Sequence, residues 1–366
     1  MTKITLSLAF ILFVSCSCGS SDSFKNISPD EYVYSQPIDL LDGVKTGDLV
    51  SQGFDTEKTS EIARDVLEDY FREVNGVLIY RNDYLVFEEY FNGFNQDTKN
   101  DIRSATKSIT GLLVGIAIDK GFLSGVDQRV FELFSQYEDF DNWDPAKEEI
   151  TVAHLLTMSS GLACDYDKVT SSGEQVLVYD VDDWVKLFLD APVRANPGEV
   201  FAYCSAGIVA LGEIIRIVSG MTVEEFSQKY LFSPLGISNY RWELTGAGQV
   251  DTAGHIRFTA RDMLKIGKLF LQNGKWDEKQ IVSGEWIAQM REPAFDDYGY
   301  TWWRSGYTGE GDFYLIYHAS GNGGNRIFVV PHHELVVVVS ASNYNSSYGA
   351  ASEYILYSLI LPQLDL

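Results

Sequence analysis

Alternating apolar and polar positions predict β-structure near both ends of the chain. Residues 77–91 read GVLIYRNDYLVFEEY, two runs rich in Val, Ile, Tyr and Phe with Asn82 and Asp83 between them. This pattern is typical of a β-hairpin. Strands are predicted again after residue 297, at 298–304, 313–318, 326–330 and 335–340. A last apolar segment, 348–361, is expected to be helical.

The period changes to that of a helix between Ile102 and Leu123. Apolar residues recur there at helical spacing, and Gly121 closes the segment. Five further helices are predicted, near 152–158, 184–189, 206–219, 223–231 and 260–271. Strands at both ends with helices between them imply that the two ends share one sheet. We therefore expect an α+β fold: an antiparallel sheet of N- and C-terminal strands flanked by helices, with a mostly helical lobe inserted at about 125–290.

The N-terminus resembles an export signal. Residues 1–18 read MTKITLSLAFILFVSCSC, in which an apolar run, Ile4–Val14, follows one lysine. The run is too short to span a bilayer and has no polar face, so it fits a secretory signal better than a buried helix. The end of this segment resembles a bacterial lipoprotein cleavage box, with Phe13 where Leu is usual. We expect residues 1–15 to be removed and Cys16 to be lipidated.

The expected domain organisation follows from that signal. Residues 16–45 would form a tether and N-terminal extension, and residues 46–366 the folded domain. Cys18 is the alternative lipid acceptor, and simple secretion is the alternative fate. The predicted location is the bacterial cell envelope, with the lipid anchor as the membrane contact; otherwise the protein is periplasmic or secreted. The sequence does not indicate an oligomeric state.

Composition and charge exclude several function classes. The chain has 366 residues, 45% hydrophobic and 22% charged, which indicates a globular protein able to hold a rigid cleft. Its 52 acidic residues against 28 basic ones give a net charge of −24, which argues against a nucleic-acid partner. His332 and His333 are adjacent rather than spaced as metal ligands, so no metal site is expected. Cys164 and Cys204 can pair in an oxidising compartment or remain buried thiols.

The tetrapeptide Ser104-Ala105-Thr106-Lys107 carries the first candidate chemistry. It lies where the long helix is predicted to begin, and positions i and i+3 share a helix face. A serine is a poor nucleophile unless a base takes its proton, and a partly desolvated lysine can do so. The spacing alone is weak evidence, because Ser-x-x-Lys also occurs on ordinary solvated helices.

Two later segments add to this interpretation. Residues 197–207 read PGEVFAYCSAG, which places Tyr203 at a loop–helix junction where a phenol can transfer protons. Residues 319–324 read ASGNGG and follow the strand predicted at 313–318. Glycines there would let a substrate approach the strand edge, and backbone N–H groups could bind an oxyanion. Each segment alone is also typical of ordinary packing or of a turn.

The order of these three motifs resembles the serine β-lactamases and penicillin-binding proteins. The chain is most similar to the class C-type branch, which includes esterases, D-amino-acid peptidases and aminohexanoate-oligomer hydrolases. The resemblance covers about residues 75–345 and includes ITVAHLLTMSSGL at 150–162 and YGYTWW at 298–303. It implies that Ser104 is the acylated nucleophile, Lys107 its activating partner and Tyr203 the general base and acid. No cofactor is implied.

The resemblance also assigns the substrate-binding positions. The backbone N–H groups of Ser104 and Asn322 would form the oxyanion hole, and Ser320 and Gly321 match the end of the third motif. Ser205 stands where the family often has Asn, and this substitution is seen in the esterase and aminohexanoate-hydrolase members of the family. Ala319 replaces a cation that helps true β-lactamases bind a substrate carboxylate. The triplet Lys45-Thr46-Gly47 also spells the third motif, but it precedes the nucleophile, so no catalytic role is assigned to it.

The leading hypothesis is an exported serine hydrolase that cleaves an ester, amide or lactam bond of a small or peptide-like substrate. A D-Ala peptidase or true β-lactamase is an alternative within the family. The hypothesis of an α/β-hydrolase that uses Ser205 is weak, because its Gly-x-Ser-x-Gly turn needs glycine at the position that Tyr203 occupies. A non-catalytic envelope receptor is a third hypothesis. Five aromatic residues are candidates for the pocket wall, although such residues are more often core: Tyr166, Tyr179, Trp184, Trp242 and Trp303.

Overall fold

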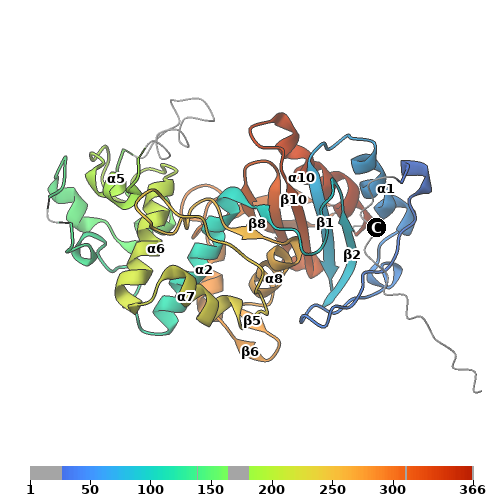
Figure 1. Ribbon diagram of the computed structural model, residues 1–366, viewed down its shortest axis with the longest axis horizontal. Helices are drawn as coiled ribbons and strands as arrows, with labels where there is room; N and C mark the ends of the chain where they lie inside the picture. Colours follow the sequence, from blue (N-terminus) through green and yellow to red (C-terminus); the bar gives the residue numbers. More distant parts are fainter. Residues whose placement is uncertain (1–26, 138, 164–180, 310, 365–366) are drawn as a thin grey trace, which may run out of the picture.

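A six-stranded antiparallel sheet is the centre of the fold. The computed structural model describes residues 27–137, 139–163, 181–309 and 311–364. The strands lie in the order β2-β1-β10-β9-β8-β7. Their bounds are β1 Val74–Arg81, β2 Tyr84–Tyr90, β7 Trp303–Thr308, β8 Phe313–Gly321, β9 Asn325–Val330 and β10 Leu335–Ala341. Figure 1 shows the blue N-terminal strands beside the red C-terminal ones.

The register of β1 joins the two ends of the chain. On one side β1 pairs with β2, and on the other it pairs with β10, where Val77 lies opposite Val339. Every neighbouring pair in the sheet is antiparallel. The predicted α+β class and the shared sheet are therefore confirmed.

Most of the described helices lie between β2 and β7 in the sequence. Two of them lie outside this range: α1 precedes β1, and α10 follows β10. The bounds of the helices are α1 Thr56–Leu67, α2 Thr106–Asp119, α3 Val152–Leu156, α5 Trp184–Asp190, α6 Ser205–Ser219, α7 Val223–Ser227, α8 Ala260–Leu271, α9 Gly284–Arg291 and α10 Ala351–Tyr354. A continuation at 355–363 lengthens α10 to the end of the described chain. Two short strand pairs, β3 Asn100–Asp101 with β4 Arg257–Phe258 and β5 Lys275–Trp276 with β6 Lys279–Gln280, complete the elements.

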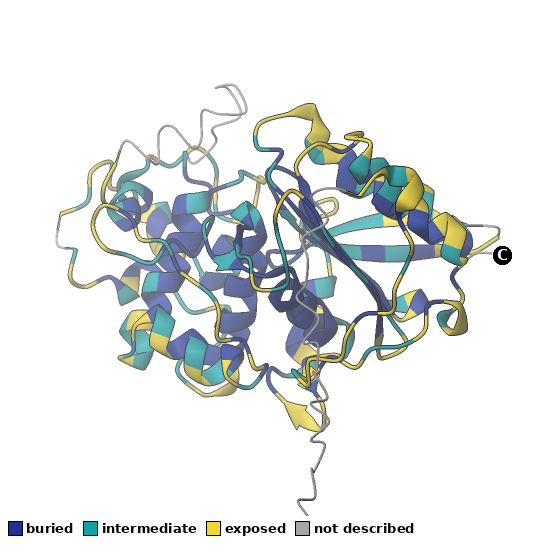
Figure 2. Cartoon of the chain, turned by 45° about the vertical axis from the view of Figure 1, so that its right-hand side comes forward, coloured by how far each residue is buried: buried dark blue, intermediate teal, exposed yellow. Residues whose placement is uncertain are grey.

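Each face of the sheet belongs to a different apolar core, because successive strand residues point to opposite sides. Val77 and Ile79 of β1 join the core that contains α1 and the α10 segment. Leu78 and Tyr80 join the larger core that contains α2, α6 and α8. In Figure 2 the strands are dark between these helices, whose outer faces remain exposed. The sheet is thus covered on both sides, and the helices between β2 and β7 extend the larger core away from it.

Helix α8 lies within the range expected for the helical lobe but packs on the sheet, where it contacts β9, β10 and β1. Its buried Gly267 explains the close fit, since a Cβ there would lie 2.5 Å from Val336. Helices α3, α5, α6 and α7 form the lobe proper, with α2 between them and the sheet (Figure 1). The nucleophile motif, at the start of α2, therefore lies at the junction of lobe and sheet.

The first strand predicted after residue 297 begins later than expected. Residues 298–302 fold back instead, with hydrogen bonds from Tyr298 N to Phe295 O and from Gly299 N to Trp302 O. Thr301 has a left-handed backbone, φ 62°, which a strand does not permit. The strand therefore starts at Trp303, and the prediction of 298–304 was wrong at its start. Helices α1 and α9 were not predicted.

Within the described ranges, no single helix has the length and apolar character needed to cross a bilayer. Only α6 together with residues 223–232 passes that test as a pair, and the pair is bent by 80°.

Candidate active site

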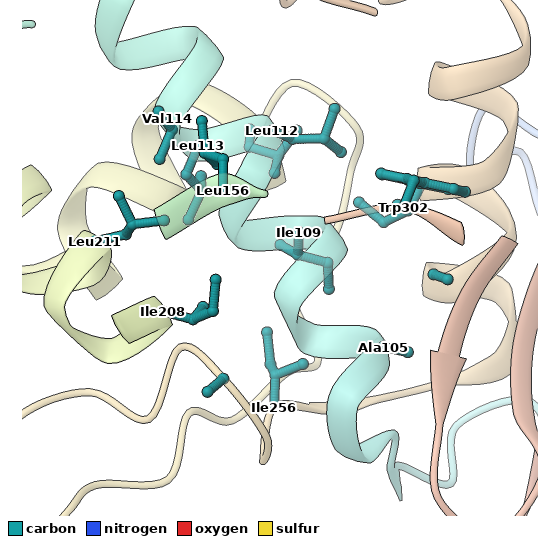
Figure 3. Packing of buried hydrophobic residues seen from close by; sticks show 14 of the residues in the cluster. Ala105, Ile109, Leu112, Leu113, Val114, Leu156, Ile208, Leu211, Ile256 and Trp302 are labelled. Carbon is teal, nitrogen blue, oxygen red and sulfur yellow. The ribbon is translucent and has the colours of Figure 1, made fainter. Parts of the chain in front are cut away.

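Ser104 lies in a short 3-10 turn, Arg103–Ala105, that leads directly into α2. Twelve of the fourteen residues of α2 are buried, so the helix is held on every side. Figure 3 shows the α2 residues Ile109 and Leu113 packed among side chains of α3 and α6. A helix fixed in this way holds the nucleophile in one place, and its N-terminus favours negative charge at Ser104.

Lys107 lies one turn along the same helix and contacts Ser104 directly. Its Nζ is 3.1 Å from Ser104 Oγ and donates a second hydrogen bond, of 2.8 Å, to the carbonyl of Ala253. The residue is only 2% exposed. The spacing of three residues predicted this convergence, whereas nothing in the sequence indicated the contact with Ala253, about 150 positions away. The pair is thus buried, oriented and in hydrogen-bond contact.

Tyr203 approaches the same pair from the loop before α6. Lys107 Nζ lies 4.7 Å from the centre of its ring, and the ring stacks on Trp303 with centroids 6.5 Å apart. The backbone on either side of Tyr203 is held by Met158, whose carbonyl accepts from Ala202 N at 2.7 Å and whose sulfur accepts from Cys204 N. The hydroxyl, the amine and the phenol ring therefore converge from two elements, as the resemblance implied.

A pocket of about 540 Å³ lies between the nucleophile and the end of β8. Ser104, Tyr203 and Trp303 line it on one side. On the other side it is lined by the turn after β8 and by the segment before α10, namely Ser320, Gly321, Asn322, Gly323, Gly324, Arg326, Ser346, Ser347, Gly349 and Ala350. Apart from Arg326, these residues are small or uncharged. The site is therefore an open groove with one aromatic wall and one backbone-rich wall.

Gly321 allows β8 to lie against the segment that carries the nucleophile. A Cβ at this position would lie 2.0 Å from the carbonyl oxygen of Ile102, two residues before Ser104. The last pair between β7 and β8 joins Trp303 to His318, so Ala319, Ser320 and Gly321 extend beyond β7. The backbone of these three residues is the part of β8 nearest the groove.

The side chains at the end of β8 alternate between the two faces of the sheet. Ala319 is fully buried in the larger core. His318 and Ser320 share the other face, with His318 Nδ1 3.1 Å from Ser320 Oγ. Burial, helped by the nearby Arg326, lowers the pKa of His318 to about 4, so the ring is neutral near pH 7. His318 therefore does not supply the positive charge that is missing because position 319 is an alanine.

Asn322 and Arg326 fix the turn that follows β8. The Asn322 side chain exchanges two hydrogen bonds with Asn345, one to its side chain at 2.7 Å and one from its backbone N–H at 3.0 Å. Arg326 donates to the carbonyl of Gly321 at 2.8 Å and forms an ion pair with Glu353 at 2.8 Å. No sequence pattern predicted these supports, because they join segments that are adjacent only in the fold.

The remaining predicted residues lie elsewhere or outside the described ranges. Ser205 is the first residue of α6 and is not among the described residues that line the groove. Cys204 caps α6 and is disulfide-bonded. Cys164, the other member of the candidate pair, lies outside the described residues, as do Cys16 and Cys18.

The other sequence candidates are also separate from the groove. Lys45 and Gly47 bond to Leu85 at the β2 edge, with β1, β10 and β9 between them and β8, which agrees with assigning that triplet no role. Of the aromatic wall candidates, Trp303 lines the groove, whereas Trp184 and Trp242 are core residues. Tyr166 and Tyr179 lie outside the described residues.

The chain was compared with known proteins. The family model described as Beta-lactamase matches residues 62–358. Penicillin-binding protein 4 of Amycolatopsis lactamdurans is 25% identical over 217 residues, which are 52% of this chain and 55% of that protein. The 6-aminohexanoate-dimer hydrolase of Paenarthrobacter ureafaciens is 25% identical over 262 residues, which are 63% of this chain and 64% of that protein. The chain thus matches less than two thirds of the length of either relative.

The fold is similar to that of solved structures in the same group. The penicillin-binding protein of Bacillus halodurans superimposes with a TM-score of 0.63 at 21% identity, over 82% of this chain and 100% of that one. This similarity concerns the fold alone, because the identity is low. The family model, in contrast, extends over most of the chain and includes the nucleophile turn, the Tyr203 loop and the β8 edge. The chain belongs to the beta-lactamase family.

Proposed function

We propose that this protein is a serine hydrolase that cleaves an ester or amide bond through an acyl-enzyme on Ser104. The observation that carries the proposal is the 3.1 Å contact between Ser104 Oγ and Lys107 Nζ, at the mouth of a groove that Tyr203 also lines. Burial of the lysine and its position beside an alcohol are what nucleophile activation requires. No metal or organic cofactor is needed for this chemistry.

The proposed reaction has two halves. Ser104 Oγ attacks the substrate carbonyl carbon while its proton passes to the Lys107–Tyr203 pair. The resulting oxyanion is stabilised by the backbone N–H groups of Ser104 and Asn322, and by the N-terminus of α2. The pair returns the proton to the leaving alcohol or amine as the carbon–oxygen or carbon–nitrogen bond breaks. A water molecule then attacks the acyl-enzyme in the same way, which releases the acid and restores Ser104.

Two residues favour esters and simple amides over β-lactams. Ala319 is fully buried and provides no cation for a substrate carboxylate, and Ser205 replaces the asparagine that the family often has. Of the relatives, the hydrolase of Paenarthrobacter ureafaciens carries the 6-aminohexanoate dimer in its name, which is a linear amide. A true β-lactamase or D-Ala peptidase is the alternative.

Export and anchoring are part of the proposal. The apolar run Ile4–Val14, followed by Cys16, supports removal of residues 1–15 and lipidation of Cys16 in the bacterial cell envelope. These residues lie outside the described ranges. In a bacterial host, Cys16→Ala is expected to move the protein from the detergent phase to the aqueous phase of a Triton X-114 extraction. Continued partition into detergent would contradict Cys16 as the acceptor and point to Cys18.

Labelling with a fluorophosphonate, followed by mass spectrometry, tests the assignment of the nucleophile. We expect modification at Ser104 and loss of hydrolysis of p-nitrophenyl butyrate in Ser104→Ala by several orders of magnitude, with unchanged thermal unfolding. Ser205→Ala is the matched variant and should still be modified at Ser104. Modification at Ser205 would instead support the α/β-hydrolase interpretation. A folded protein that neither reacts nor hydrolyses any ester, amide or lactam would support the receptor interpretation.

A further inference from the structure

The loop that leads into β4, after α7 and the helical turn that follows it, supplies the second acceptor of Lys107. Ala253, in this loop, accepts the 2.8 Å hydrogen bond from Lys107 Nζ. The neighbouring Thr252 attaches the loop to the helical lobe, because its hydroxyl donates to Ile208 O at 2.8 Å and its carbonyl accepts from Thr110 at 2.6 Å. The position of the lysine amine thus depends on where this loop lies.

His255 joins the same loop to the turn that carries the nucleophile. Its Nδ1 lies 2.9 Å from Asp101 Oδ2. Asp101 accepts a 3.0 Å hydrogen bond from Arg103 N and forms an ion pair with Arg103 Nε at 3.2 Å. Arg103, which directly precedes Ser104, has a left-handed backbone with φ 52°. Such a conformation is costly for a residue with a side chain, so it persists where surrounding contacts enforce it.

The other nitrogen of His255 faces a second carboxylate. Burial acts to raise the pKa of Asp101, but the hydrogen bonds and charges of His255 and Arg103 together outweigh it and lower that pKa, so Asp101 is ionised and Nδ1 must donate. Nε2 then faces Asp251 Oδ2 at 3.9 Å, within ion-pair distance of a protonated ring. Asp251 is only 3% exposed and accepts from Ala253 N at 3.0 Å.

Asp251 also interacts with Lys107. Burial raises the pKa of the Asp251 carboxyl, and the positive charges of His255 and Lys107 act against that rise. Because the interaction between two titrating groups is reciprocal, a charged Asp251 favours the protonated lysine. The charged and titratable members of this network are Asp101, Arg103, Lys107, Tyr203, Asp251, His255, Arg257 and Tyr344.

We propose that Asp251 and His255 are positioning residues: Asp251 sets how readily the Lys107–Tyr203 pair gives up its proton, and His255 clamps the loop to the turn before Ser104. The buried Asp251 carboxylate holds the backbone N–H of Ala253, whose carbonyl is the acceptor of Lys107, and His255 bonds to Asp101 beside the nucleophile turn. The inference deepens the proposed hydrolase function and rests on it. The two residues do not touch the reacting atoms; they act through Lys107.

The test is the pH profile of kcat/KM for p-nitrophenyl butyrate, between pH 5 and pH 10, in single variants. The rising limb reports the pH at which the lysine–tyrosine pair loses its proton. Asp251→Asn removes the counter-charge and is expected to move this limb to lower pH by roughly one unit. His255→Ala removes the donor to Asp101 and is expected to lower kcat/KM by about tenfold, whereas His255→Gln keeps an N–H donor and should restore most of that loss. Asp262→Asn removes a buried carboxylate of α8 that accepts from Thr259, and it should leave both the limb and the rate unchanged.

A shifted limb in Asp251→Asn, together with rescue of the His255→Ala rate by His255→Gln, supports the inference, because a loss of packing alone moves no limb and is not rescued by the conservative variant. A limb that stays in place in folded Asp251→Asn overturns it, and so do equal rates of the two His255 variants. Circular dichroism melting identifies variants that do not fold. If Asp251→Asn is one of them, the comparison of the two His255 variants decides by itself. Ser104→Ala is measured in parallel: if it keeps its activity, the proposed function fails, whereas if it is inactive and neither the limb nor the His255 rates change as expected, only this inference fails.

Discussion

Two adjacent glutamates on β2 provide opposite tests of what burial does to a carboxylate. Glu89 is 3% exposed and accepts a 2.6 Å hydrogen bond from the hydroxyl of Tyr32. Burial raises the pKa of this carboxyl from 4.5 to about 7. Glu88, on the opposite face, forms a 2.6 Å ion pair with Arg261 of α8 instead. Among the described residues, Glu89 therefore has no cationic partner of the kind that Arg261 provides for Glu88.

The sign and size of the Glu89 effect follow from linkage. Because its folded pKa lies above the unfolded value, its contribution to stability is complete below about pH 4.5 and is lost as pH rises through about 7. The two values differ by about 2.5 pH units, and at 1.36 kcal/mol per unit the loss approaches about 3 kcal/mol. Glu89→Gln cannot ionise and can still accept from Tyr32. It should match the wild type near pH 4.5 and exceed its free energy of unfolding by about 2–3 kcal/mol at pH 8.

Urea denaturation followed by circular dichroism, at intervals between pH 4.5 and pH 8, measures this difference. Glu88→Gln is the matched control and should be less stable than the wild type by about 3 kcal/mol at pH 7, since it leaves the buried Arg261 with the half-buried Asp42 as its remaining carboxylate partner among the described residues. An advantage of Glu89→Gln that does not grow with pH would refute the reasoning. Equal effects of the two substitutions would refute it as well.

Two further substitutions test close contacts made by glycine. Gly115→Ala places a Cβ 2.2 Å from the Trp286 ring, so it should lower the free energy of unfolding by about 2 kcal/mol in the same urea titration. Gly284→Ala is the control, since its Cβ meets nothing nearer than 3.7 Å and the substitution should be nearly neutral. Equal stabilities would contradict this. Gly321→Ala should displace β8 from Ile102 and lower kcat/KM by about 100-fold, measured on p-nitrophenyl butyrate beside a melting curve. A fully active Gly321→Ala would show that the β8 edge does not need this close approach.

Much of the fold could be predicted because local patterns agree with their tertiary surroundings. The hairpin at 77–91 and strands β8 to β10 have alternating or continuous apolar residues that match their burial. Helix α1 was missed although Asp55 caps it by accepting from Lys58 N, because its apolar face is narrow and most of its surface is polar. The start of β7 could not be predicted, since a backbone reversal at Thr301 interrupts an apolar run that reads as a strand.

The candidate site was predictable where its residues are close in sequence. Ser104 and Lys107 converge because of helix geometry alone. Tyr203 and Asn322 were placed by resemblance, as no local rule brings a loop and a turn about 100 and 200 positions away to the same groove. His255 and Asp251 carried no recognisable signal, because their relevance arises only when Ala253 meets the lysine. Long-range convergence of this kind depends on the assembled core rather than on any segment.

The pairing of β1 with β10 has a consequence for how this protein is made. Val77 pairs with Val339, so about 260 further residues must be synthesised before the two strands can meet. Contacts of such sequence separation slow folding, and until they form the apolar edge of β1 is open to pairing with other chains. A nascent chain that stops short of β10 would therefore be a substrate for chaperones rather than a smaller working protein.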